Sequence, residues 1–157
     1  YKNDELNQQS FSQNGWFHTG DVGKWVDEKF LQIVGRKKEI FKISNGRYVT
    51  PLRIEEELIK SPLIAQAIVF EKMGKVNAVL VVPEEANRGE AALQKEVDKC
   101  YNNQVVESER IVDFIIETTP WSVEAGELTP TMKLRRPVIL AKYSAMSGCF
   151  VINTKKK

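Results

Sequence analysis

The sequence predicts an α+β fold in which a small antiparallel sheet is flanked by helices. Short apolar runs separated by turn residues indicate β-hairpins, and the segments between them carry apolar residues at helical spacing. This mixture of hairpins and interspersed helices favours an α+β arrangement over a doubly wound sheet. With 157 residues, 42% of them hydrophobic, the chain can form one modest core and an appendage.

The first part of the chain is predicted to be a short helix followed by a hairpin. Asn3 or Asp4 can cap a helix that ends at about Ser10. Strands at 23–26 and 30–34 flank a polar turn, which is typical of a hairpin.

A second hairpin is predicted at Asn45-Gly46, between strands at 39–44 and 47–49. Asn-Gly tolerates the positive φ angles of a type I′ turn, and this is the strongest short-range hairpin signal in the sequence.

The central part of the chain predicts a helix and two core strands. Thr50 supplies a helix cap and Pro51 a first helical residue, and Ser61-Pro62 ends the helix. The β-branched, apolar runs 64–70 and 76–82 then predict two antiparallel strands.

The last third predicts two more helices around a strand and a long loop. An amphipathic helix is expected over 85–105 and a third core strand over 111–116. Residues 118–132 have no periodicity and contain proline and glycine, which indicates a loop. Pro137 opens a last helix, which we expect to end at Ser147-Gly148.

Composition narrows the class of protein. Cys100 and Cys149 are far apart and lack partners at metal-ligand spacing, so neither a disulfide framework nor a zinc site is indicated. No apolar run has the length of a membrane helix and the opening residues do not resemble a signal peptide, so we expect a cytoplasmic protein.

The basic residues fall into two separated groups, although the net charge is only +2. Each group lies next to glycine or proline, which suggests loops that face anions. Charge alone does not exclude nucleic acid as a partner. The first group is Arg36, Lys37, Lys38, Lys42, Arg47 and Arg53, and the second is Lys133, Arg135, Arg136 and Lys142.

Three segments, in this order, resemble the adenylate-forming (AMP-binding) enzyme superfamily. They are Gly15–Asp21 (GWFHTGD), Gly35–Lys42 (GRKKEIFK) and Leu128–Arg136 (LTPTMKLRR). The residues of the third segment, together with Arg47–Pro51, are similar to those of long-chain fatty acid CoA ligases. The resemblance extends from Tyr1 to about Tyr143.

This resemblance implies the end of a two-domain ligase. Such enzymes join a fatty acid to ATP as an acyl-adenylate with release of pyrophosphate, and CoA then displaces AMP. Residues 1–35 would be the tail of the amino-terminal domain, 36–146 the mobile carboxy-terminal lid and 147–157 a tail. The phosphate-binding loop and the acyl pocket of the family lie in the amino-terminal domain, so this partner domain is required and the isolated chain is expected to be inactive. Mg²⁺ is expected in the complete enzyme, without a ligand from this chain.

The resemblance also implies roles for six residues. Lys133 matches the catalytic lysine of the adenylation step, Asp21 the aspartate that binds the ribose, and Arg36 an arginine that contacts the nucleotide. Lys38 occupies the hinge position about which the lid turns between the two steps. After this turn Lys42 would face the nucleotide, and Gly46 would leave room for the pantetheine arm of CoA, because only glycine permits so close a backbone approach.

Several points stay open from the sequence. Many superfamily members have Ser-Gly before the catalytic lysine, whereas this chain has Thr131-Met132, as long-chain members commonly do. The lone histidine, His18, offers no ligand set and is not catalytic in the motif. For the ligase we expect no nucleic-acid partner. A fatty acyl-AMP ligase that loads an acyl carrier protein is an alternative, as is a non-catalytic module that binds nucleotide, CoA or nucleic acid. Acyl chain length and peripheral membrane contact are not readable.

Overall fold

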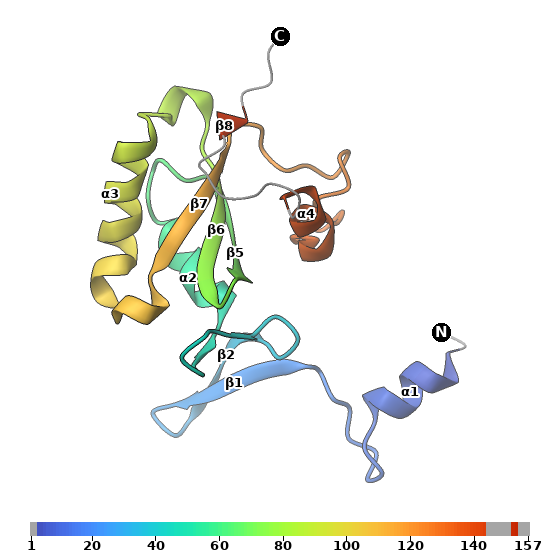
Figure 1. Ribbon diagram of the computed structural model, residues 1–157. Helices are drawn as coiled ribbons and strands as arrows, with labels where there is room; N and C mark the ends of the chain where they lie inside the picture. The colour runs from blue at the N-terminus through green and yellow to red at the C-terminus, as the bar shows by residue number, and fades with distance from the viewer. Residues whose placement is uncertain (1–2, 144–151, 154–157) are drawn as a thin grey trace.

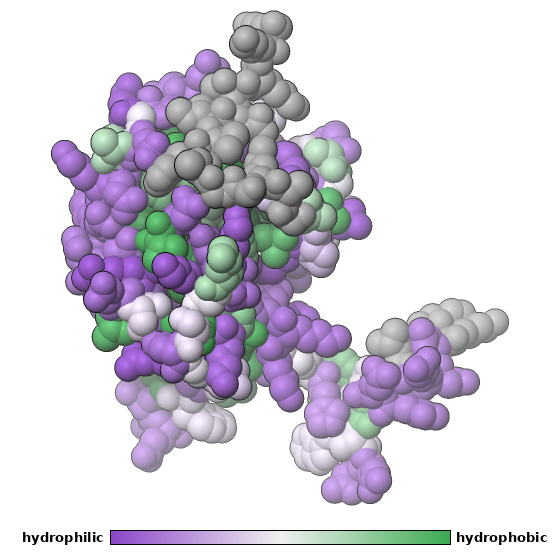
Figure 2. Space-filling model, viewed as in Figure 1, coloured by the Kyte–Doolittle hydropathy of each residue, from purple (hydrophilic) through white to green (hydrophobic). Residues whose placement is uncertain are grey.

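The computed structural model describes residues 3–143 and 152–153, which form a globular body with an extended amino-terminal arm (Figure 1). The arm contains helix α1 (Asp4–Ser10) and the antiparallel strands β1 (Asp21–Val26) and β2 (Phe30–Arg36). Figure 2 shows α1 standing clear of the body. The predicted first helix and first hairpin are therefore confirmed.

The second hairpin is shorter than predicted, with strands β3 (Phe41–Lys42) and β4 (Tyr48–Val49). The turn lies at the predicted place, but its predicted type is wrong. Gly46 has a φ of 87°, whereas Asn45 is not among the described residues with positive φ. A type I′ turn needs two such residues, as found at Asp27-Glu28 in the first hairpin, with φ angles of 50° and 56°, and at Met73-Gly74 between β5 and β6, with 53° and 74°.

Helix α2 (Pro51–Leu58) begins with proline at its first position, as predicted. Thr50 precedes it in an extended conformation but makes no side-chain capping hydrogen bond. The helix therefore relies on its packing: Ile54 and Leu58 lie one turn apart and are 2% and 0% exposed.

The main sheet has four strands in the order β5-β6-β7-β8: β5 (Gln66–Lys72), β6 (Lys75–Val81), β7 (Ile111–Glu117) and β8 (Ile152–Asn153). Strands β5 and β6 are antiparallel, as predicted, while β7 joins β6 in parallel. The α+β class with small antiparallel sheets is confirmed, but this sheet is mixed. The reason is the connection from β6 to β7, because a parallel neighbour needs a crossover, and helix α3 provides it.

Helix α3 (Glu90–Cys100) is shorter at both ends than the predicted 85–105. Gly89 before it has a φ of 84°, and Tyr101 after it has a φ of −138°, so neither continues the helix. Short 3-10 turns cover the remaining stretches: η1 (Glu84–Ala86), η2 (Asn102–Gln104) and η3 (Glu107–Glu109). The Cys100 thiol is free and partly buried.

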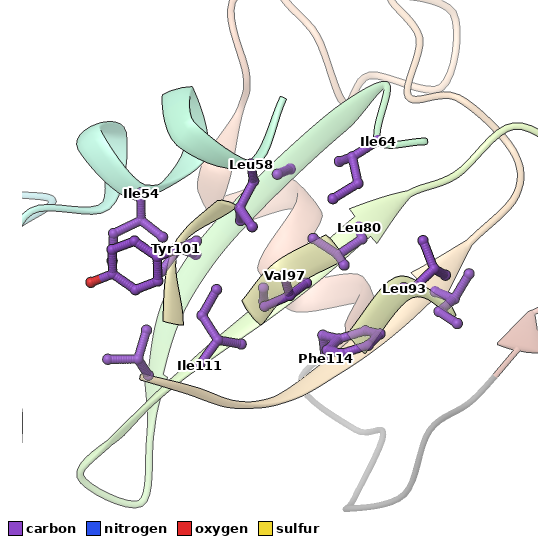
Figure 3. Close-up of a cluster of buried hydrophobic side chains, with 14 of the residues drawn as sticks. Ile54, Leu58, Ile64, Leu80, Leu93, Val97, Tyr101, Ile111 and Phe114 are labelled. Atoms are coloured by element: carbon purple, nitrogen blue, oxygen red, sulfur yellow. The ribbon is translucent and has the colours of Figure 1, made fainter. Parts of the chain in front are cut away.

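The sheet separates two apolar clusters because alternate side chains of a strand point to opposite faces. Helices α2 and α3 cover one face, where Leu80 and Phe114 meet Leu58, Leu93 and Val97 (Figure 3). On the other face, the second cluster combines strand residues with residues of the 118–135 segment and of helix α4 (Arg136–Tyr143): Ile68, Val79, Val81, Ile115, Trp121, Leu128, Ile139 and Tyr143.

Helix α4 begins one residue before Pro137. Its predicted end at Ser147-Gly148 lies outside the described residues, as does the tail 147–157 apart from β8. No helix within 3–143 and 152–153 has the length and apolar character needed to cross a membrane.

Candidate functional site

Asp21 and Arg36 face each other at the open end of the first hairpin. Asp21 is the first residue of β1, Arg36 is the last of β2, and the two are paired in the strand register. Arg36 Nε lies 2.9 Å from Asp21 Oδ1, with side-chain exposures of 60% and 25%. Thr19 Oγ1 accepts the Asp21 backbone N–H at 3.1 Å, which fixes the start of the strand. A carboxylate and a guanidinium are thus held together and open to solvent.

These two side chains line a hollow of about 770 Å³ next to helix α1. Lys38 and the exposed His18 line it as well. The structure therefore brings together three of the predicted site residues, Asp21, Arg36 and Lys38. In the described part of the chain no group of three His, Cys, Asp or Glu side chains could hold a metal ion.

Lys38 lies in a tight turn directly after β2. Arg36 O accepts the N–H of Glu39 at 3.0 Å and that of Ile40 at 3.2 Å. The exposed Lys37 and Lys38 form the tip of this turn. The predicted hinge residue is thus the second residue past the hairpin, where the chain leaves the arm for the body.

Arg136 fastens the next residue, Glu39, to the body. Its Nε lies 3.0 Å from Glu39 Oε2, and its other nitrogens bond Glu55 and the carbonyl of Val69. The side chain is only 13% exposed, so the prediction of an anion-facing loop is wrong for Arg136. Burial raises the pKa of Glu55, although Arg136 and the Val69 N–H, 2.7 Å from Glu55 Oε1, act to lower it.

A second hollow, of about 690 Å³, lies between β5, α4 and the turn that contains Lys38. Lys38 and Glu39 line it on one side, and Phe70, Ile115 and Leu140 supply apolar surface. The turn at Lys38 and Glu39 therefore borders both hollows.

Gly46 belongs to a tight loop at the end of the second hairpin, Ile43–Arg47, which we call the glycine loop. Gly46 N–H donates to Ile43 O at 2.9 Å and Ile43 N–H to Arg47 O at 3.0 Å, with Gly46 in the left-handed region. This is a three-residue hairpin loop closed by a left-handed residue. Behind it, Lys42 and Tyr48 are opposite each other and exposed, with Lys42 Nζ 6.0 Å from the ring centroid.

Lys133 ends a loop of the same kind, Thr129–Lys133, which we call the lysine loop. Met132 N–H donates to Thr129 O and Thr129 N–H to Lys133 O, both at 2.8 Å, and Met132 has a φ of 61°. Thr129 Oγ1 also accepts the Lys133 N–H at 3.0 Å. The Lys133 side chain is exposed and makes no ion pair within the described residues.

An ionic cluster with buried carboxylates holds the base of the lysine loop: the Glu117 and Glu127 side chains are 3% and 8% exposed, and Lys142 is 41% exposed. Lys142 Nζ lies 2.9 Å from Glu127 and 3.3 Å from Glu117, and Tyr143 donates to Glu117 at 2.8 Å. Burial alone would raise the pKa of Glu117, but the Thr119 N–H, the Tyr143 hydroxyl and Lys142 together lower it. Burial would lower the pKa of Lys142, but the hydrogen bonds that it donates to Glu127 and Tyr143 raise it. Lys142 was predicted to face anions outside the domain, but its ammonium group instead pairs with Glu117 and Glu127 of the body.

The predicted site residues thus occupy three places. Asp21, Arg36 and Lys38 share one hollow, whereas neither Lys133 nor the Lys42 and Gly46 hairpin lines it. Figure 1 shows the lysine loop in the orange segment beside α4, away from the hairpin below the sheet.

Sequence reasoning missed the residues that hold these places together. Glu55 and Arg136 are 81 positions apart, and no local pattern marks either as a buried ion-pair partner. The one available signal for the cluster at the lysine loop was its excess of acids, Glu117 and Glu127, near Lys142.

A family model described as the AMP-binding enzyme C-terminal domain matches residues 38–146. The chain belongs to this family. Its matched region begins at the predicted hinge residue, Lys38, and includes Lys42, Gly46 and Lys133.

The domain is similar to curated long-chain ligases. Long-chain-fatty-acid–CoA ligase 6 of Rattus norvegicus is 35% identical over 159 residues, covering 87% of this chain and 23% of the relative. Long-chain-fatty-acid–CoA ligase FadD15 of Mycobacterium tuberculosis is 32% identical over 167 residues, covering 92% and 28%. The chain therefore spans about a quarter of the length of these relatives.

Solved structures support the fold of this AMP-binding C-terminal domain. The A domain of carboxylic acid reductase from Segniliparus rugosus, in complex with AMP and a co-purified carboxylic acid, matches with a TM-score of 0.84 and 32% identity, covering 92% of this chain and 24% of that one. ATP-bound MatB from Rhodopseudomonas palustris matches with a TM-score of 0.73 at 22% identity, covering 94% and 28%, which supports the fold alone.

Proposed function

We propose that this chain is the carboxy-terminal part of an ATP-dependent long-chain-fatty-acid–CoA ligase, which forms an acyl-adenylate and then an acyl-CoA thioester. The observation that carries the proposal is its similarity to long-chain ligases over 87% to 92% of its length. Fatty acid, ATP and CoA are the substrates, and the amino-terminal domain of the same enzyme is the partner that this domain closes upon. We place the enzyme in the cytoplasm, with peripheral membrane contact as a compatible arrangement.

In the first step two anions must approach each other, and a positioned cation lowers the cost of this approach. Lys133 is suited to the role because its ammonium group is exposed on a defined turn and has no carboxylate partner within the described residues. Lysine is a compact point charge on a flexible stem, so it can reach into a site on a facing domain.

Asp21 and Arg36 are proposed to hold the nucleotide at the hollow beside α1. A carboxylate can accept hydrogen bonds from both hydroxyls of a ribose, and a guanidinium can donate to ribose or phosphate oxygens. Their pairing at 2.9 Å keeps both side chains in place before the nucleotide arrives. Mg²⁺ would be held by groups outside the described residues.

The second step is proposed to use the other surface of the domain. Lys133 and Gly46 lie on different loops, and neither lines the hollow that contains Asp21. A rotation at Lys38 would let these surfaces face the nucleotide in turn, as hinge residues absorb a change in backbone angles. Gly46 would then lie beside the pantetheine arm and Lys42 beside the nucleotide.

A carrier protein as acyl acceptor is the second candidate. One similar structure, with a TM-score of 0.83 and 31% identity, is the A-PCP didomain of carboxylic acid reductase from Segniliparus rugosus. Thioester formation with CoA alone, compared with an acyl carrier protein alone, separates the two acceptors.

Lys133→Ala in the full-length enzyme tests the proposal. We expect acyl-adenylate formation, measured as ATP–pyrophosphate exchange, to fall by about 100-fold or more, because the cation acts where charge develops. Conversion of supplied acyl-adenylate to thioester should change by less than about twofold, because Lys133 is turned away in that step.

Lys95→Ala is the matched control, since Lys95 is an exposed lysine on α3 that neither step uses. It should leave both half-reactions unchanged. Equal losses in both half-reactions for Lys133→Ala would contradict the role of Lys133.

A further inference from the structure

The glycine loop is braced by a neighbouring turn of the main sheet. Strands β5 and β6 are joined by the two-residue turn Met73-Gly74, and the Ser44 N–H of the glycine loop donates to Gly74 O at 2.9 Å. Figure 1 shows the small hairpin next to this end of β5 and β6. The two turns are therefore connected backbone to backbone.

Gly74 permits this contact in two ways. Its φ of 74° lies in the left-handed region, which disfavours a side chain. A Cβ at this position would also lie 2.8 Å from Ser44 Cβ and 3.3 Å from Ser44 N, so the glycine loop would have to move away. Any side chain at position 74 therefore displaces the loop that carries Gly46.

The brace matters because the tip of the small hairpin is exposed, whereas Ile43 and Val49 at its base are buried, 3% and 5% exposed. Its strands β3 and β4 are two residues long each, and an isolated two-stranded hairpin is at best marginally stable. The turn that supports it belongs instead to the central sheet, where Val76 and Ala78 of β6 are completely buried. The sheet thus provides a fixed point for the exposed loop beyond this buried base.

We propose that Gly74 is a positioning residue for thioester formation. It holds the glycine loop in the position in which the loop backbone can lie against the pantetheine arm of CoA. This inference rests on the proposed function. Gly74 itself contacts no substrate in this arrangement: it acts through Ser44. A shift of the loop by a few tenths of an ångström to an ångström would narrow or misalign the path of CoA without affecting the lysine loop.

Gly74→Ala in the full-length enzyme is the test. We expect kcat/KM for CoA, measured with supplied acyl-adenylate, to fall by about 10- to 100-fold, because misplacement on the order of an ångström has effects of this size. Most of the loss should appear in the KM for CoA. ATP–pyrophosphate exchange should stay within about twofold, since the lysine loop is held by a different cluster.

Two variants separate the contact from general strain. Gly89 has a φ of 84° and a ψ of 164°, a region essentially restricted to glycine, yet a Cβ there would meet nothing within 4 Å, so Gly89→Ala carries at least as large a backbone penalty without a displaced neighbour. It should leave the KM for CoA unchanged. Adding Ser44→Gly to Gly74→Ala removes the nearest clashing atom and should restore most of the lost kcat/KM.

A second route to the same loss avoids position 74. Ser44→Pro removes the N–H that bonds Gly74 O, and proline is favoured at the first central position of a tight turn. It should raise the KM for CoA even if Gly74→Ala fails to fold. The proposal is overturned if both variants leave the KM for CoA unchanged, or if Gly89→Ala raises it equally.

Gly46→Val distinguishes this proposal from its premise. If Gly46→Val blocks the CoA step and the folded Gly74→Ala and Ser44→Pro variants do not, the brace is wrong and the CoA surface stands. If Gly46→Val leaves the CoA step intact, the glycine loop is not the CoA surface and the brace loses its function with it.

Discussion

The glycine loop and the lysine loop have similar backbone conformations, but different contacts hold them in place. Each is a three-residue hairpin loop whose two closing hydrogen bonds measure 2.8 to 3.0 Å, with a left-handed residue before its last position. The left-handed residue is Gly46 in one and Met132 in the other. Beyond its buried base at Ile43 and Val49, the glycine loop is also held by Gly74 through the Ser44 N–H, whereas the lysine loop is held at its base by Glu127.

This difference matches what each loop is proposed to do. A surface that admits a ligand against its backbone needs that backbone fixed, and the contact with the central sheet fixes it. A lysine that reaches across to a facing domain needs an anchored base and a free tip, and Lys133 is exposed beyond the buried cluster. One turn geometry is thus adapted to two tasks by where the rest of the domain holds it.

The largest expected effect concerns the base of the lysine loop. Glu127→Ala should destabilise this chain by about 2–3 kcal/mol, because its carboxylate bonds Lys142 at 2.9 Å and the Ser122 N–H at 3.3 Å in a buried place. The matched change near the glycine loop is Glu109→Ala, which breaks an exposed pair with Arg47 and should cost about 1 kcal/mol or less. Urea unfolding measures both, and equal costs would contradict the difference in anchoring.

Lowering the pH should also destabilise the cluster that holds the lysine loop, but by less than Glu127→Ala does. The folded pKa of Glu117 is lowered, so its contribution to stability is present above its unfolded pKa and is lost as pH falls through the folded pKa. Glu55 has the opposite sign, because its raised pKa gives a contribution that is present at low pH and lost as pH rises through the folded pKa.

Urea midpoints from about pH 7 to about pH 3 test these signs. Glu117→Gln should reduce stability most at neutral pH, and its difference from the unmodified chain should shrink in acid. Glu55→Gln should not show this convergence. The same pH dependence for both variants would count against the assignment.

Strain at the left-handed position is the next effect. Gly46→Ala should cost about 1–2 kcal/mol, because an L-residue is disfavoured in this region. A Cβ there would lie 3.7 Å from Lys42 Cε, an ordinary contact, so no clash adds to the cost. Gly46→Asn should cost less, since asparagine tolerates this conformation. Thermal unfolding of the two variants gives the comparison, and a larger loss for asparagine would argue against backbone strain.

Sequence patterns predicted the elements whose formation depends on residues close together in the chain. Helix α2, the β5–β6 pair and the place of the second hairpin follow from Pro51 at the first helical position, apolar runs and Asn45-Gly46, all of which act within a few residues. The parallel pairing of β7 with β6 was not predicted, because the direction of β7 depends on how the α3 crossover packs on the sheet. For the candidate site, motif resemblance singled out Asp21, Arg36 and Lys133 but gave no sign of the residues that hold them.

The supports were missed because they join positions far apart in the chain. Ser44 meets Gly74 only after two hairpins have formed, and Arg136 meets Glu39 only when α4 has packed beside β5. Charge patterning assigned Arg136 and Lys142 to an anion-facing surface, since they belong to a basic group that lies next to proline. Whether their carboxylate partners are buried depends on the tertiary structure, so a short segment of sequence does not show it.

The smallest effect is a gain, and it tests whether the two loops differ at the left-handed position for stability or for function. Met132→Gly should stabilise the chain by about 0.5–1 kcal/mol, because relief of about 1–2 kcal/mol of backbone strain exceeds the added entropy of an unfolded glycine. Little packing is lost, as Met132 is 68% exposed. Thermal unfolding measures the gain. If the variant is instead less stable, the Met132 side chain must make a compensating contact; if it is more stable while ATP–pyrophosphate exchange falls, the strained residue is retained because it orients Lys133.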